Sequence, residues 1–121
     1  MIEEAYVTLE TAELLRDLGF DEITTRHFYN GKPDTCTIIT KQKNSDEVRG
    51  IDYCSRPTQQ MVLDWLVVKH KVSLEVGWKG KGWGFQIVFM SGEKEKSERS
   101  DYPTRREATE EGLMDVLKKY V

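Results

Sequence analysis

Two tryptophans bracket two lysines in the short stretch Trp78-Lys79-Gly80-Lys81-Gly82-Trp83. Indole rings can stack on nucleobases, and lysine ammonium groups neutralise phosphates. A second basic pair, Arg105-Arg106, follows a threonine later in the chain. The alternative is that the tryptophans face the core and the lysines only keep a tight turn soluble. The candidate surface for binding nucleic acid or another partner consists of Trp78, Lys79, Lys81, Trp83, Arg105 and Arg106.

Residue types that carry covalent or metal chemistry are sparse in this chain. The only histidines are His27 and His70, and the only cysteines, Cys36 and Cys54, lack the CxxC spacing of a zinc site. A catalytic site would need a histidine beside a nucleophile and an acid, which only an unforeseen long-range arrangement could supply. We therefore expect a protein that is not an enzyme, with no catalytic residues, no metal and no cofactor.

The two cysteines could pair with each other. If a hairpin turn is centred near Ser45, Cys36 and Cys54 stand opposite each other on neighbouring strands. In a reducing compartment, cysteines on strands are more often small buried hydrophobic residues. Both alternatives stay open at this point.

Glycines are dense between residues 77 and 84, which could indicate a phosphate-binding loop. Neither a helix start nor a Lys-Ser or Lys-Thr pair follows them, so the P-loop pattern is incomplete. Turn formation explains these glycines better.

Charge and composition exclude few partners. The net charge of −3 and the pI near 5.5 argue against a broad polyanion-binding face, although a local basic patch is compatible with them. The longest apolar run, residues 61–68, contains Asp64 and is too short to cross a bilayer. The N-terminus has no signal-peptide pattern. We therefore expect a cytoplasmic protein without a membrane partner.

Three threonines each begin an apolar stretch at helical spacing, namely Thr8, Thr58 and Thr104, and strand-like sequence fills both gaps. The near-equal spacing suggests a helix followed by three strands, used twice and closed by a third helix. The predicted fold is a single α+β domain over residues 1–121. Its order is α-βββ-α-βββ-α, with antiparallel meanders packed against helices and a weak sixth strand. A pseudo-repeat would cover residues 8–56 and 58–102, with the closing helix at 104–120.

Turn and cap signals place the elements of the first half. Thr8 is a predicted N-cap, and Gly19 lies where a left-handed residue ends a helix. Asn30-Gly31 is a strong hairpin signal between strand-like residues 23–29 and 35–40. A third strand is expected over residues 48–53.

In the second half, residues 58–70 are apolar on nearly every side, which predicts the central and most buried helix. Alternating residues predict a half-buried hairpin over 72–78 and 83–89. The polar stretch 93–101 predicts a weak edge strand. Thr104 and Glu107 form a capping box, and Gly112 inside the last helix suggests a close packing contact.

Residues along nearly the whole chain resemble a group of uncharacterised phage and prophage proteins of gut Bacteroidetes. The resemblance implies a phage-related accessory protein and no particular activity. It rests on Thr8-Leu9-Glu10-Thr11-Ala12, Leu14-Leu15, Gly19-Phe20, Pro57-Thr58-Gln59, Trp65-Leu66, His70, Thr104, Glu107-Ala108 and Leu113.

From Pro57 onward the predicted α-βββ-α order is also similar to a double-stranded-RNA-binding domain. Thr104-Arg105-Arg106-Glu107-Ala108 resembles that family's Ser-Lys-Lys-x-Ala helix start, which implies phosphate contacts by the two arginines. The chain departs from the family at Thr109, where the family has another lysine, and in lacking a histidine between Trp78 and Trp83.

The favoured interpretation is a non-enzymatic, phage-related binding module whose target is unknown. A double-stranded-RNA-binding-like domain is the alternative. A protein partner or self-association is also open, and it would require an exposed apolar patch.

Overall fold

Helix α1 spans Leu9–Asp17 and has well-defined ends. The Thr8 hydroxyl accepts a hydrogen bond from the Thr11 N–H at 3.4 Å, which confirms the predicted N-cap. At the other end Gly19 has a φ of +91°, and the Phe20 N–H donates to the Leu15 carbonyl. This bond and the one from Gly19 to Arg16 form a Schellman motif, which buries Phe20.

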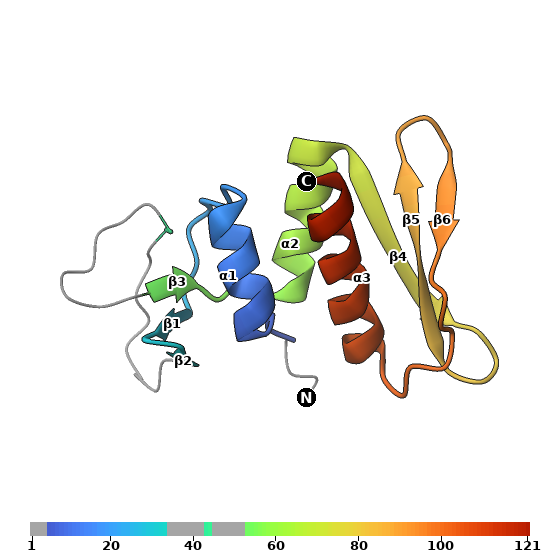
Figure 1. Ribbon diagram of the computed structural model, residues 1–121, viewed down its shortest axis with the longest axis horizontal. Coiled ribbons are helices and arrows are strands. Elements are labelled where there is room, and N and C mark those ends of the chain that lie inside the picture. Colours follow the sequence, from blue (N-terminus) through green and yellow to red (C-terminus); the bar gives the residue numbers. More distant parts are fainter. Residues whose placement is uncertain (1–4, 34–42, 45–52) are drawn as a thin grey trace. The chain divides into compact units, whose positions relative to one another are not determined.

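The computed structural model describes residues 5–33, 43–44 and 53–121. The chain forms two compact units, residues 1–58 and 59–121, which we call unit 1 and unit 2. Each unit contains one three-stranded antiparallel sheet, as Figure 1 shows. The α+β class and the predicted element order are confirmed.

The sheet of unit 1 contains β1 (His27–Tyr29), β2 (Lys32–Pro33) and β3 (Tyr53–Ser55). Asn30 and Gly31 both have positive φ, as a two-residue type I′ turn requires, and β2 begins directly after them. The predicted hairpin turn is therefore confirmed, whereas its expected second strand, residues 35–40, lies outside the described residues.

The strand order in unit 1 is β2-β1-β3, so the meander expected there is wrong for the described strands. Cys54 stands opposite Phe28 of β1 and is buried. Its proposed partner Cys36 lies outside the described residues. The described third strand, Tyr53–Ser55, includes the last residue of the predicted range 48–53, and the rest of that range lies outside the described residues. The Asn44 side chain links this strand to α1 because it accepts from the Ser55 N–H and donates to the Phe20 carbonyl, both at 2.7 Å.

Unit 2 begins with α2 (Gln59–Trp65), which continues as a π-helical segment, η1, over Leu66–His70. A π-turn adds a residue to the helical register, so it rotates the following side chains relative to the α-helical spacing. Val67 and Val68 in this segment are exposed. The expectation that this would be the most buried helix is therefore wrong, since only Gln59, Val62, Trp65 and Leu66 are buried in it.

The sheet of unit 2 is a meander of β4 (Val72–Trp78), β5 (Trp83–Phe89) and β6 (Lys94–Lys96). The register runs from Val72 opposite Phe89 to Trp78 opposite Trp83. The predicted hairpin is confirmed, and the sixth strand is as weak as expected, with three residues.

Helix α3 (Arg105–Tyr120) packs on β4 and β5 and also contacts α2 (Figure 1). Thr104 accepts a hydrogen bond from the Glu107 N–H at 3.1 Å, as the predicted cap requires. Gly112 makes the expected close contact, because a Cβ there would lie 2.8 Å from a methyl group of Leu74 and 3.1 Å from Phe85. Tyr120 near the end of the helix is exposed, and its hydroxyl donates to Glu95 on β6.

We predict that Gly82→Ala destabilises the protein. A Cβ at Gly82 would lie 2.7 Å from the Asp101 backbone, which cannot move as a flexible side chain can. The free energy of unfolding in urea should fall by about 1–3 kcal/mol, as for other overpacked sites. Gly77→Ala is the matched control in the same hairpin, because a Cβ at Gly77 has no neighbour within 4 Å. Equal effects of the two substitutions would contradict the close approach.

Candidate functional site

The tip of the β4–β5 hairpin carries an exposed tryptophan pair. The Lys79 N–H donates to the Gly82 carbonyl at 2.7 Å, which keeps the tip short. Trp78 and Trp83 stand opposite each other in the register, with ring centroids 5.9 Å apart and ring planes at 77°. Trp78 is 61% exposed, so its side chain is not buried in the core. Trp83 is half-buried and supports the edge-to-face contact.

Alternation along β4 places Trp78 on the same face of the sheet as Val72 and Leu74, the face that packs against α3. The pair therefore extends the apolar face of the sheet beyond its buried part. Both lysines of the tip, Lys79 and Lys81, are exposed.

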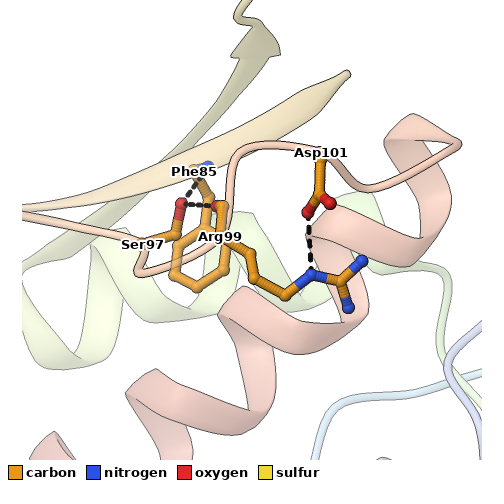
Figure 2. Close-up of polar contacts among 4 residues, drawn as sticks. All are labelled: Phe85, Ser97, Arg99 and Asp101. Carbon is orange, nitrogen blue, oxygen red and sulfur yellow. Dashed lines mark hydrogen bonds and ion pairs between the residues drawn. The ribbon is translucent and has the colours of Figure 1, made fainter. Parts of the chain in front are cut away.

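The segment that follows β6, residues 97–102, runs back along β5 and pairs with it beside the tryptophans. Ser97 exchanges hydrogen bonds with the backbone of Phe85, and its hydroxyl also donates to the Arg99 carbonyl (Figure 2). Further along, the Trp83 and Tyr102 backbones donate to each other's carbonyls at 2.9 and 3.1 Å. The return segment is thereby fixed to the strand that carries Trp83.

The glycines of the hairpin have different roles, and turn formation explains only one of the four. Gly80 alone among them has positive φ, at +92°. Gly82 and Gly84 are instead required because the backbone of residues 100–102 lies against them. The interpretation of all four glycines as turn formers is therefore wrong.

The first turn of α3 lies at the same end of unit 2 as the tryptophans. Tyr120, near the C-terminus of the helix, packs edge-to-face on Phe89 at 4.9 Å, whereas Tyr102, shortly before its N-cap, pairs with Trp83. The helix therefore runs away from the hairpin tip, and the exposed pair Arg105 and Arg106 lies at the tip end.

The geometry of α3 and β4 locates Arg105 within this end of unit 2. Arg105 precedes Gly112 by two turns, about 10.5 Å, so both lie on the side of α3 that faces the sheet. Gly112 contacts Leu74, and Trp78 lies four residues further along β4, about 13 Å away in the same direction. Arg105 therefore lies toward the tip end of unit 2. Arg106 is held on the side of α2, because its carbonyl accepts from the Gln59 side chain at 3.1 Å.

Sequence reasoning did not identify two further residues of this end, Arg99 and Tyr102. The Arg99 guanidinium carbon lies 4.4 Å from the centre of the Tyr102 ring. The Nε of Arg99 donates to Asp101 at 2.8 Å, as Figure 2 shows. Gly82 and Gly84 were the sequence signal that could have pointed to this segment, since glycine inside a strand marks the close approach of another backbone.

These contacts shift the ionisation of the residues involved. The hydrogen bond from Arg99 lowers the pKa of the Asp101 carboxyl, and the same bond raises the pKa of Arg99. Burial, followed by the negative charge of Glu111, raises the pKa of the Tyr102 hydroxyl. Carboxylates of α3 therefore lie on the Tyr102 side of this end.

The charges are distributed unevenly between the units. Residues 1–58 contain seven basic and eleven acidic side chains, whereas residues 59–121 contain eleven basic and ten acidic ones. A local basic end on an acidic chain is consistent with these numbers.

Neither histidine belongs to the hairpin end of unit 2. His27 is buried in unit 1, with its ring about 6 Å from those of Tyr29 and Tyr53. His70 packs edge-to-face on Trp65 at 4.6 Å. Among the residues whose positions are described, no three His, Cys, Asp or Glu side chains gather in a way that could hold a metal ion. In the same part of the chain, no helix is long and apolar enough to cross a membrane.

Comparison of the chain with models of protein families, with curated proteins and with solved structures found no match.

We predict that Arg99→Met raises the pKa of Asp101 toward its ordinary value, because the hydrogen bond that lowers it is lost. In the native protein this carboxylate contributes stability above its ordinary pKa, and that contribution is lost as the pH falls through the lowered value. NMR titration of the carboxyl carbon measures the change. Arg105→Met is the control, since Arg105 has no part in the shift. An unchanged Asp101 titration in Arg99→Met would contradict the assigned cause.

Proposed function

We propose that this protein is a non-enzymatic binding module and that the hairpin end of unit 2 binds nucleic acid. The observation that carries the proposal is the exposure of Trp78 beside Trp83, at a hairpin tip that also carries the exposed lysines Lys79 and Lys81. A large exposed aromatic side chain surrounded by cations is typical of surfaces that bind nucleic acids.

The chemistry of the ligand follows from these side chains. Lys79, Lys81, Arg105 and Arg106 are exposed and can contact phosphates without breaking a described ion pair. Arg99, by contrast, is held by Asp101 and serves to position Tyr102. Affinity should therefore come from a few phosphate contacts, with the indole adding contact to the bases.

The resemblance to phage proteins supports an accessory role in a phage or prophage. We infer a cytoplasmic site of action, because nucleic acid of the host and of an infecting phage is found there.

We expect the full-length chain to bind a labelled oligonucleotide with an affinity that falls as salt rises. Lys79→Ala/Lys81→Ala and Arg105→Ala/Arg106→Ala should each weaken binding. Each phosphate contact that is lost should reduce the slope of log affinity against log salt by about 0.7–0.9. Fluorescence anisotropy at several salt concentrations measures both quantities.

Lys94→Ala/Lys96→Ala is the matched control, because it removes two exposed lysines from β6, which pairs with β5 away from Trp83. An affinity that does not depend on salt, or an equal loss in the control, would contradict the proposal. If no oligonucleotide binds and the hydrodynamic size rises with concentration, self-association becomes the better interpretation.

A further inference from the structure

We infer that the hairpin end of unit 2 binds single-stranded nucleic acid in preference to duplex, with an unpaired base stacked on Trp78. This inference rests on the proposed function and adds the form of nucleic acid that the site takes.

The first reason is the position and exposure of Trp78. It stands at the end of a strand, on the α3-facing side of the sheet, beyond the part that the helix covers. The edge-to-face contact with Trp83 orients its ring, while 61% of the residue remains accessible. Base stacking needs the accessible face of an unpaired base, and a continuous duplex encloses those faces between neighbouring pairs.

The second reason is the shape of the hairpin tip. Only Gly80 and Lys81 lie between the hydrogen-bonded residues Lys79 and Gly82. So short a tip cannot reach far into a groove. The Lys79 stem also folds back, since its Cγ lies 3.2 Å from where a Cβ on Gly84 would be. The Lys79 stem therefore starts out along β5 beside Gly84 and does not extend the tip.

The third reason is the distribution of charge. A duplex presents two rigid rows of phosphates, which favour cations spread along a face. Here the cations of α3 lie in its first turn, at the tip end, and in its last turn at the opposite end, and Glu107, Glu110 and Glu111 directly follow the first-turn arginines. A flexible single strand can place its phosphates beside Arg105 and the tip lysines and avoid those carboxylates.

Three ligands with equal strand length test the inference on the full chain: a fifteen-nucleotide oligothymidylate, an abasic strand with the same number of phosphates, and a fifteen-base-pair duplex. The oligothymidylate should bind most tightly. Trp78→Ala should weaken its binding by about five-fold or more, the loss that corresponds to about 1 kcal/mol of stacking, and should leave binding of the abasic strand unchanged.

Two further variants test whether the loss of affinity is specific to the aromatic ring at position 78. Trp78→Phe keeps a ring at this position and should retain much of the affinity. Met90→Ala removes another exposed apolar side chain of unit 2, at the β5–β6 turn, and should have no effect. Thermal unfolding of each variant checks that it is folded.

The outcomes separate the inference from the proposed function. If the abasic strand binds as tightly as oligothymidylate, or if the duplex binds more tightly, nucleic-acid binding stands and base stacking on Trp78 is rejected. An equal loss in Trp78→Ala and Met90→Ala rejects it as well. If none of the three ligands binds at low salt, both the function and the inference are rejected.

Discussion

The paired backbone bonds between Trp83 and Tyr102 are the constraint on which the binding end of unit 2 depends. They hold the return segment against β5, and the close approach leaves room only for glycine at residue 82. Since α3 begins three residues after Tyr102, the same bonds bring its first turn to the hairpin tip. One backbone contact thus positions both the tryptophan pair and the arginines.

Packing and charge have separate roles in this unit. Gly112 allows α3 to lie close to Leu74 and Phe85, which buries the middle of the sheet. The strands extend past that buried part, and the apolar face ends in Trp78. Acidic side chains of α3 and Asp101 limit the positive field to a few groups, one of which, Arg99, is already paired. Such a surface favours a local and salt-sensitive contact over a broad polyanion-binding face.

The two units use the same order of elements and connect their strands differently. In unit 2 each strand pairs with the next, whereas in unit 1 β3 returns to pair with β1. Helix caps and turn sequences are similar in both halves of the chain. The sequence therefore predicted the same meander in each half. Strand order depends on which edge of the hairpin a distant strand pairs with. Burial and side-chain contacts such as those of Asn44 decide this pairing, and local propensity does not.

The elements that the sequence determined by itself are those whose hydrogen bonds join near neighbours. Thr8, Gly19, Asn30-Gly31 and Thr104 end helices or form a turn within a few residues, so their residue types suffice to identify them. The π-helical segment, the exposure of Trp78 and the role of Gly82 could not be identified in that way. Each depends on contacts between residues that lie far apart in the chain, such as Gly82 with Asp101 and Leu74 with Gly112. A glycine inside a strand or helix can mark a close approach, as at Gly82 and Gly112, but the residue that approaches it is decided only when distant segments pack together.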